Sequence, residues 1–358
     1  MWAPPLIDWY NAHQRELPWR IHPHPYHTLI CEFMAQQTQI NTLIPYYERW
    51  LIKYPTIQDV ANSSEDSILK SWEGLGYYSR ARNLHKTCQV ITNDYNAVVP
   101  DSPDILLSLP GVGPYISAAV ASIAYEIPVA VVDGNVLRVF TRLYGLFDDI
   151  GKDKTKQTIQ KRLNQDIQQY QPSVFNQGLM ELGATICTPK KPNCIQCPLS
   201  SICYAKNMDQ TETLPIKSKK APIPHHTVVV AIIKNNQDHF LITKRKKNQL
   251  LGGLWEFPGG KVKSNETLED ALHREIKEEV NLDIKINGFL CKVDHAYSHF
   301  KITMHAFICD VIDPSNLSCK SADDYSWINV TQLDEFAFPK ANSVVIAHLN
   351  TKDKSTVD

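Results

Sequence analysis

Four cysteines lie close together near the middle of the chain, with the spacing C-x6-C-x2-C-x5-C. They are Cys187, Cys194, Cys197 and Cys203. Four thiolates in one short loop can hold a [4Fe–4S] cluster or close a tetrahedral shell around zinc. Zinc sites usually pair two C-x2-C arms across a longer gap, and only one arm here has that form. The spacing therefore favours an iron–sulfur cluster, with zinc as the alternative.

A second candidate site combines a glycine-rich turn with a carboxylate further along the chain. Gly111 and Gly113 lie in LPGVGPYIS, a tight turn that opens a predicted helix. Backbone amides at such a helix start can bind a phosphate, because the helix dipole favours an anion there. Asp133 ends an apolar run and precedes a glycine at the start of another predicted helix. A structural turn between core helices and a simple helix N-cap are the alternatives.

A third candidate site consists of three glutamates near the C-terminal end of the chain. Glu275, Glu278 and Glu279 fall at i, i+3 and i+4 in a helix predicted over 267–280. Three carboxylates on one helical face could bind hydrated Mg²⁺, the possible second metal of this chain. A solvated acidic helix face is the alternative.

The elements that must position these residues change in character along the chain. From Leu6 to about Tyr204, apolar residues recur at helical spacing, which predicts an all-α domain over 1–206 that includes the cysteine loop 187–203. Residues 207–225 are polar and lysine-rich, as linkers are. Strands predicted at 227–233, 239–243 and 300–308, with the helix 267–280, indicate an α+β domain over 226–358.

Length and composition agree with a multi-domain globular protein. The chain has 358 residues, enough for two domains, and a net charge of −1, which gives no electrostatic argument for a nucleic-acid partner. Its start lacks a secretory pattern, and Glu126 and Pro128 interrupt the longest apolar stretch, 118–132. We therefore expect no membrane association and a cytoplasmic protein, which the odd number of cysteines also favours.

The order of these motifs resembles the helix–hairpin–helix DNA glycosylase superfamily. The hairpin LPGVGPY, the distal Asp133 and the cysteine quartet carry that resemblance. CEFMAQQT at 31–38, GLGYYSR at 74–80 and DGN at 133–135 are similar to the adenine DNA glycosylase (MutY) family. This resemblance implies a monomeric, nucleoid-associated base-excision repair enzyme with a [4Fe–4S] cluster. Its partner would be duplex DNA containing adenine mispaired with 8-oxoguanine or guanine.

The same resemblance assigns the catalytic groups. Glu32 would be the general acid that protonates adenine, and Asp133 would stabilise the oxocarbenium-like sugar, with Tyr115 and Asn135 positioning them. Endonuclease III has a lysine nucleophile where Tyr115 stands, so the resemblance implies a monofunctional glycosylase. Glu32 lies in the apolar segment ICEFMA, where desolvation should raise its pKa. A solvent-facing helix residue is the alternative for Glu32.

The DNA contacts also follow from the resemblance. A flipped base leaves a gap in the duplex that side chains must fill. The implied wedge residues are Gln37 and Tyr77. Thr38 and Leu75 would lie beside the opposite base. Arg20 and Gln177 match positions that contact the adenine.

Residues 226–349 resemble the Nudix-like C-terminal domain of the same family, which recognises 8-oxoguanine. Tyr297, Ser298 and His299 stand where family members carry Phe-Ser-His. Most such domains have lost the metal-binding Nudix box, yet residues 260–282 keep nearly all of it, with Asn281 in place of a glycine. Asparagine tolerates the left-handed conformation that this position requires.

Two other classes of function remain open at this point. One is a nucleotide pyrophosphohydrolase whose first domain only carries it to DNA. The other is a catalytically idle DNA-binding or sensing protein built around the cluster. The pair of Glu32 and Asp133 favours the glycosylase, since a DNA-binding module would not need it.

Overall fold

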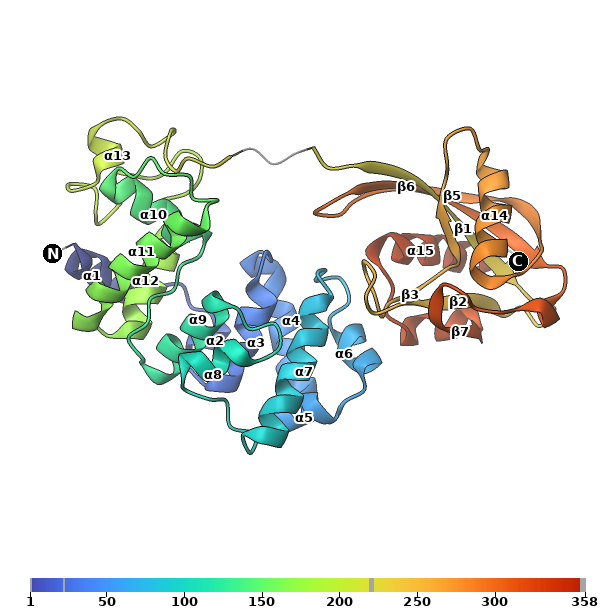
Figure 1. Cartoon of the computed structure of the whole chain (residues 1–358), viewed down its shortest axis with the longest axis horizontal. Coiled ribbons are helices and arrows are strands. Elements are labelled where there is room, and N and C mark those ends of the chain that lie inside the picture. The colour runs from blue at the N-terminus through green and yellow to red at the C-terminus, as the bar shows by residue number, and fades with distance from the viewer. Residues whose placement is uncertain (1, 22, 219–221, 355–358) are drawn as a thin grey trace. The chain divides into compact units, whose positions relative to one another are not determined.

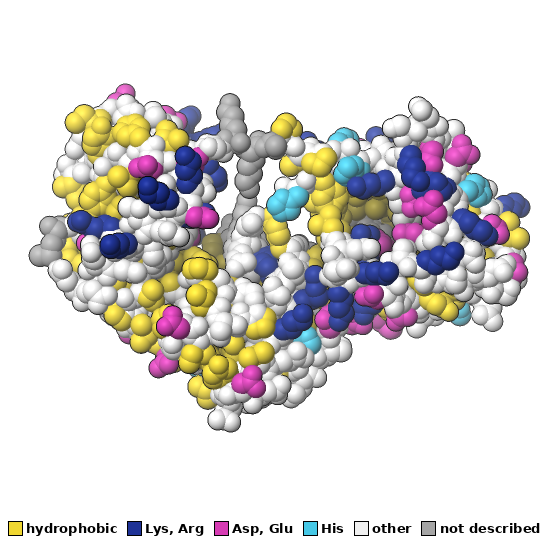
Figure 2. All heavy atoms as spheres, viewed as in Figure 1, with side chains coloured by type: hydrophobic (Ala, Val, Ile, Leu, Met, Phe, Trp, Pro, Cys, Tyr) yellow, Lys and Arg dark blue, Asp and Glu magenta, His cyan; other side chains and the backbone are white. Residues whose placement is uncertain are grey.

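The computed structural model describes residues 2–21, 23–218 and 222–354 and divides into two compact units (Figure 1). The first unit comprises Met1–Asn62 and Asn83–Lys220, and the second comprises Ser63–Arg82 and Ala221–Asp358. As expected, a helical region precedes a region that contains a sheet. Basic and acidic side chains are interspersed on the face that Figure 2 shows, in keeping with the small net charge.

The first unit is built from helices joined by short loops. Its helices up to the glycine turn are α1 (Ala3–His13), α2 (Pro18–Ile21), α3 (Pro25–Ala35), α4 (Ile40–Lys53), α5 (Ile57–Asn62), most of α7 (Ser79–Asp94) and α8 (Pro103–Ser108). The later helices are α9 (Pro114–Tyr125), α10 (Gly134–Tyr144), α11 (Asp153–Asp166), η1 (Ile167–Gln169), α12 (Pro172–Thr185) and α13 (Tyr204–Asn207). Several carry proline in their first turn, where a residue without an N–H leaves no hydrogen-bond donor unsatisfied.

Helix α9 is the apolar centre of the first unit. Its residues from Ile116 to Ser122 are all buried, and it packs against α3, α8 and α12. Helix α12 in turn packs against α1 and α10. This arrangement brings α3, α9, α10 and α12 together, and these four helices carry most of the candidate catalytic residues.

Part of the segment expected to be a linker packs on the first unit. Arg142 of α10 is 2% exposed, so its guanidinium needs protein acceptors. Its Nε donates to the carbonyl of Leu214 at 2.8 Å and its Nη2 to that of Thr211 at 2.7 Å. The amide of Ile150 also donates to the carbonyl of Ile216 at 3.0 Å. Ser218 also donates to the carboxylate of Asp149, so the chain is held to the helices as far as Ser218.

The second unit is a sheet with a helix on each face. Its strands are β1 (His225–Lys234), β2 (Phe240–Arg245), β3 (Trp255–Glu256), β4 (Gly259–Lys261), β5 (Ile284–Ala296), β6 (Lys301–Val311) and β7 (Ala322–Ile328). Within the described residues the order is β3-β2-β1-β6-β5, with β4 paired to β1 and β7 to β2. Strands β1 and β6 are parallel, and the other pairs are antiparallel.

Alternate residues of β1 pack on opposite faces of the sheet. Val229, Ala231 and Ile233 face α14 (Leu268–Val280), while Val230 and Ile232 face α15 (Lys340–Lys354). Short 3₁₀ turns, η2 (Pro314–Asn316) and η3 (Val330–Glu335), join the last elements. The sequence pattern predicted α14 but not α15, whose apolar residues complete the second face.

Segment 63–82 belongs to the second unit although it lies within the range expected for the first domain. It contains α6 (Glu65–Ser71). Lys70 donates to the carbonyl of Phe336 at 2.9 Å, and the amide of Phe338 donates to Glu73 Oε1 at 2.9 Å. Hydrogen bonds between residues so distant in sequence leave no periodic pattern in the sequence, so this packing could not be predicted from it. None of the helices in the described residues is long and apolar enough to cross a membrane.

Candidate active site

An open cavity of about 710 Å³ in the first unit gathers most of the predicted catalytic and adenine-contacting residues. Its volume lies within the range of small-molecule sites. Its walls come from α2, α3, α9, α10 and α12. The predicted residues that line it are Arg20, Glu32, Thr38, Tyr115, Asp133, Asn135 and Gln177.

Glu32 lies in the middle of α3 and is 7% exposed. Burial raises its pKa to about 7, opposed by a hydrogen bond from the Tyr115 hydroxyl and reinforced by the charge of Asp133. Its Oε2 has no hydrogen-bond partner among the described residues. A carboxyl group that is half protonated at neutral pH and has an unused oxygen suits a general acid.

Asp133 is the N-cap of α10 and also lines the cavity. Its Oδ1 accepts from the amide of Val136 at 2.7 Å, and its Oδ2 accepts from Asn135 Nδ2 at 2.8 Å. Burial raises its pKa, while these hydrogen bonds oppose the rise. The N-cap alternative and a functional role are therefore compatible, because capping fixes the carboxylate at the cavity wall.

Asn135 is held in turn by Arg138, which the sequence analysis did not single out. Arg138 Nη2 donates to Asn135 Oδ1 at 2.8 Å and to the carbonyl of Gly183 at 2.7 Å. Its Nε donates to the carbonyl of Cys187 at 2.6 Å. Gly183 leaves room for this packing, since a Cβ there would lie 2.6 Å from Asn135 Cβ. Arg138 thus links the Asp133–Asn135 pair to the first cysteine of the quartet.

Arg20 and Gln177 are bonded to each other and to a carboxylate that the sequence analysis also missed. Arg20 Nε donates to Gln177 Oε1 at 3.1 Å, and its Nη2 donates to Glu181 Oε2 at 2.8 Å. Arg15 Nε binds the other oxygen of Glu181 at 2.6 Å. Glu181 is 1% exposed. Its position one helical turn after Gln177 was the only signal that could have found it.

The two predicted wedge residues share an uncommon backbone conformation. Gln37 has φ 57° and Tyr77 has φ 48°, both in the left-handed region that non-glycine residues rarely adopt. Such conformations cluster at functional sites, where the surrounding structure holds them. Gln37 lies in the first unit just after α3, whereas Tyr77 and the 8%-exposed Leu75 lie in the second unit.

The glycine turn opens a helix, as its sequence predicts. Gly111 has φ +74°, and a Cβ there would lie 2.5 Å from Asn83 Cβ. Gly113 is the N-cap of α9, and Pro114 is its first residue. The turn therefore requires glycine at 111, and the free helix start leaves amides available for a phosphate.

The four cysteines of the quartet line one small cavity beside Arg142. Arg142 Nη1 lies 3.4 Å from Cys187 Sγ. Across residues 2–21, 23–218 and 222–354, no three His, Cys, Asp or Glu side chains are grouped to hold a metal ion. Four free thiols beside a buried cation nevertheless fit an anionic iron–sulfur cluster, because thiolates are its usual donors.

In the second unit, the loop after β5 presents the three residues expected to recognise 8-oxoguanine. Ser298 and His299 are exposed. The ring of Tyr297 turns inward and stacks on Phe300, with centroids 4.6 Å apart and planes inclined by 19°. The rings of Tyr77 and His299 meet edge to face, with centroids 6.3 Å apart. Leu75 and Tyr77 line one surface cavity together with this loop.

The expected magnesium site on α14 is not formed in the described residues. Arg274 binds Glu275 at 2.6 Å and lies 3.4 Å from Glu278. Glu279 instead accepts from the amide of Gly259 at 3.0 Å. Arg274 and the backbone thus already bind these carboxylates. Asn281 ends the helix in the left-handed conformation, with φ 56°, as expected.

Two protein-family models match the chain. Residues 30–165 match the HhH-GPD superfamily of base excision DNA repair proteins, and residues 229–348 match the NUDIX domain. A solved thermostable thymine-DNA glycosylase is 29% identical, with a TM-score of 0.52 over 57% of this chain and 94% of that one. A trapped endonuclease III–DNA covalent intermediate is 27% identical, with a TM-score of 0.50 over 57% and 93%. The fold and the site thus define a helix–hairpin–helix base-excision DNA repair protein.

Two curated relatives show which family of DNA repair proteins this chain resembles over most of its length. The adenine DNA glycosylase of Buchnera aphidicola subsp. Acyrthosiphon pisum is 33% identical over 300 residues, covering 82% of each chain. The adenine DNA glycosylase of Homo sapiens is 31% identical over 357 residues, covering 84% of this chain and 65% of that one. The chain belongs to the adenine DNA glycosylase family. It is a DNA repair enzyme that binds duplex DNA and hydrolyses N-glycosyl bonds.

Proposed function

We propose that this enzyme excises adenine paired with 8-oxoguanine or guanine in duplex DNA, as a monofunctional glycosylase. The observation that carries this proposal is the pairing of Glu32 and Asp133 at one cavity, with the pKa of Glu32 raised to about 7. Cleavage of an N-glycosidic bond needs an acid for the leaving base and a negative charge beside the cationic sugar. These two carboxyl groups supply both requirements.

Glu32 acts first as the acid. Its proton passes to adenine, so the base leaves as a neutral molecule while the bond between the sugar C1′ and the base nitrogen breaks. The hydroxyl of Tyr115 donates a hydrogen bond to Glu32 and stabilises the carboxylate that forms. The carboxylate then accepts a proton from the water that adds to C1′, which regenerates the acid and leaves an abasic site.

Asp133 stabilises the positive charge that develops on the sugar. Its hydrogen bonds from Asn135 and Val136 fix the carboxylate before the reaction begins, so little reorganisation is needed in the transition state. No lysine amine stands at position 115, so the residue there cannot form an imine with the sugar. We therefore expect base release without strand cleavage.

The remaining candidate residues bind the substrate in this proposal. Arg20 and Gln177 contact the flipped adenine, and the salt bridge from Arg20 to Glu181 limits the positions that its guanidinium can take. Gln37 and Tyr77 fill the gap in the duplex, with Thr38 and Leu75 beside the opposite base. Gly111 and Gly113 bind a backbone phosphate at the start of α9.

Recognition of 8-oxoguanine is assigned to the loop of the second unit. Exposed Ser298 and His299 provide hydrogen-bonding groups for the oxidised base. Tyr297 stacks on Phe300, so its role in this proposal is to support the loop from inside rather than to stack on DNA.

We propose that Cys187, Cys194, Cys197 and Cys203 hold a [4Fe–4S] cluster. The cluster would brace the loop that follows α12. Arg142 and Arg138 would connect this loop to α10, since both donate hydrogen bonds to its carbonyls. The absorbance of the purified protein near 400 nm, with iron and sulfide analyses, tests this assignment against zinc.

Single-turnover excision on matched duplexes tests the function. The wild-type protein should release adenine from A:8-oxoguanine and A:G duplexes and leave an A:T duplex intact. Glu32→Gln should lose excision by at least about 100-fold, because general acid catalysis contributes on the order of 10²–10⁴. Binding to the A:8-oxoguanine duplex should stay within a few-fold of wild type, since the phosphate contacts remain.

Glu48→Gln is the matched control, because Glu48 is an exposed glutamate on neighbouring helix α4. It should excise adenine at the wild-type rate. Full turnover by Glu32→Gln would refute the assignment of the acid. Equal excision from A:8-oxoguanine and A:T duplexes would refute the assignment of the substrate.

A further inference from the structure

The segment 63–82 carries two residues proposed to contact the DNA gap, Leu75 and Tyr77, and it belongs to the second unit. We call residues 74–77 the wedge segment. The loop 297–299 belongs to the same unit, and both line one surface cavity of about 480 Å³. The contacts that attach the segment to the sheet therefore set where the wedge segment lies relative to this loop.

Glu73 directly precedes the wedge segment and attaches it to another part of the second unit. Its Oε1 accepts from the amide of Phe338 at 2.9 Å, and its Oε2 accepts from Lys70 Nζ at 2.7 Å. Lys70 also donates to the carbonyl of Phe336 at 2.9 Å. A backbone group cannot move away by changing rotamer, so these bonds fix the segment more firmly than an ion pair between two flexible side chains would.

The two backbone groups in this contact lie in a well-packed part of the second unit. Phe338 is buried, and its ring stacks on Phe257 with centroids 5.8 Å apart. The ring of Phe336 meets Trp255 edge to face, with centroids 5.0 Å apart. The amide of Trp255 also donates to the carbonyl of Ala337 at 2.9 Å. The wedge segment is thus attached to the core of this unit and not to a surface loop.

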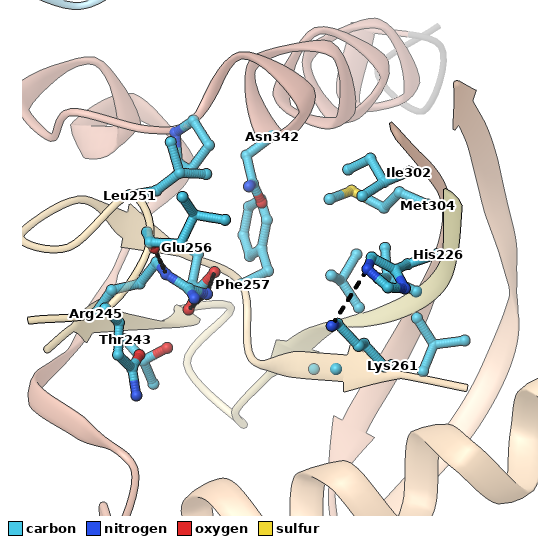
Figure 3. A pocket seen from close by; sticks show the side chains of 18 of the residues that line it. His226, Thr243, Arg245, Leu251, Glu256, Phe257, Lys261, Ile302, Met304 and Asn342 are labelled. Carbon is cyan, nitrogen blue, oxygen red and sulfur yellow. Dashed lines mark hydrogen bonds and ion pairs between the residues drawn. The ribbon is translucent and has the colours of Figure 1, made fainter. Parts of the chain in front are cut away.

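The loop between β2 and β3 forms another wall of the same surface cavity. Arg245 Nη1 lies 2.7 Å from each carboxylate oxygen of Glu256, a pair that joins the two strands (Figure 3). Arg245 Nε donates to the carbonyl of Leu250 at 2.9 Å. These bonds fix the loop, whose residues 249–251 line the cavity together with the wedge segment.

The ends of the segment 63–82 contact strand β2 and this loop. Lys244 Nζ, on β2, lies 2.6 Å from Asp66 Oδ1. Arg82 donates to the carbonyl of Gly252. The side chain of Asp66 is 53% exposed, so its ion pair contributes little by itself. These contacts orient the two ends of the segment, and the attachment at its middle decides where the wedge segment lies.

We propose that Glu73 and Lys70 are positioning residues that hold the wedge segment beside the loop 297–299, so that discrimination of 8-oxoguanine from guanine depends on them. This inference rests on the proposed function, because it takes the roles of the wedge segment and of the loop from there. The rings of Tyr77 and His299 meet edge to face, so the two elements are in contact. Neither positioning residue contacts DNA in this proposal, and both act through the wedge segment.

The physical reason is the conformational freedom that binding removes. A wedge and a loop that are already held together lose less freedom on binding than two independent elements. The oxidised base offers the loop an N7–H donor and an O8 acceptor that guanine lacks. In a loosened variant, part of the free energy of these contacts is lost in ordering the wedge segment. Loosening should therefore slow excision opposite 8-oxoguanine more than excision opposite guanine.

Single-turnover excision from A:8-oxoguanine and A:G duplexes tests the proposal. The ratio of the two rates is compared between variants, so a uniform loss of activity cancels. Glu73→Ala should lower this ratio at least fivefold. Lys70→Met keeps the apolar stem but loses the ammonium group, and it should lower the ratio by a smaller factor because the bond from Phe338 to Glu73 remains. If Glu73→Ala does not fold, Lys70→Met carries the test.

Glu335→Ala is the matched control, because Glu335 is an exposed glutamate directly before Phe336. Its ratio should equal that of the wild type. A double-mutant cycle with Ser298→Ala gives a second readout that a general loss of stability would not change. Ser298→Ala should lower the ratio in the wild-type background and have a several-fold smaller effect in the Glu73→Ala background.

An unchanged ratio in both Glu73→Ala and Lys70→Met would overturn this inference and leave the proposed function intact. Independent, multiplicative effects of Glu73→Ala and Ser298→Ala would also overturn it. A wild-type chain that excises adenine from neither duplex, or from both at equal rates, would contradict the proposed function and this inference with it. The wild-type rates therefore distinguish the two failures.

Discussion

Replacing Tyr115 by phenylalanine should shift the pH dependence of catalysis upward. Burial raises the pKa of Glu32, and the hydrogen bond that the Tyr115 hydroxyl donates to Glu32 lowers it. The net result is a pKa of about 7. A hydrogen bond to a charged group contributes about 1.5–3 kcal/mol, and about 1.4 kcal/mol corresponds to one pKa unit. The pKa of Glu32 should therefore rise by about one to two units in Tyr115→Phe.

The sign follows from the role of Glu32 as an acid, which is active only when protonated. With a pKa of about 7, about a tenth of the wild-type protein is active at pH 8. After a rise of one unit, about half of the variant is active at that pH. Single-turnover rates from pH 5.5 to 9, each set normalised to its own maximum, measure this shift even if the variant is slower throughout.

Tyr125→Phe is the matched control for this experiment. Tyr125 is the last residue of the same helix, α9, and its hydroxyl donates to the carbonyl of Val99, away from the carboxyl groups. Its pH profile should coincide with that of the wild type. A midpoint for Tyr115→Phe at or below the wild-type midpoint would show that this hydroxyl does not control the acid.

Three further predictions follow from buried contacts. Glu32→Gln should raise the free energy of unfolding by about 3 kcal/mol at pH 8. In the wild type, the buried carboxyl group of Glu32 resists ionisation, so the folded state loses stability as the pH rises from 4.5 to about 7, and the variant avoids this loss. Denaturation at pH 4.5 should show almost no difference between the two proteins. Arg138→Ala should slow single-turnover excision at least about tenfold by releasing Asn135, whereas a rate equal to wild type would contradict the link seen in the structure. Gly111→Ala should lower the free energy of unfolding in urea by more than about 1 kcal/mol, because the residue has φ +74° and its Cβ would collide with Asn83; an unchanged midpoint would contradict this.

Features that depend on short segments could be predicted from the sequence. The glycine turn requires Gly111 because its conformation is local, and α9 begins at Pro114 as the segment LPGVGPY indicates. The apolar segment around Glu32 predicted burial and a raised pKa, and both are present. The asparagine at 281 adopts the helix-ending conformation expected of it.

Contacts between distant segments could not be predicted in this way. Glu181 and Arg138 were missed because an arginine or glutamate on a helix is usually solvated, and only packing against other helices makes these two buried partners of the site. The three glutamates of α14 are the opposite case, because the sequence predicted a site that the described residues do not form. Helical spacing placed them on one face, but it could not show that Arg274 and the amide of Gly259 bind their carboxylates.

The sequence by itself determined the two classes of fold, the order of the motifs and the apolar surroundings of Glu32, since periodicity and local conformation depend on neighbouring residues. Only the tertiary structure decided that segment 63–82 packs with the sheet, because individual hydrogen bonds connect this segment to residues more than 250 positions away. It also decided which buried polar groups have partners. Asn342 is an ordinary helix residue in the sequence, and only the folded chain leaves its Oδ1 buried and unpaired among the described residues.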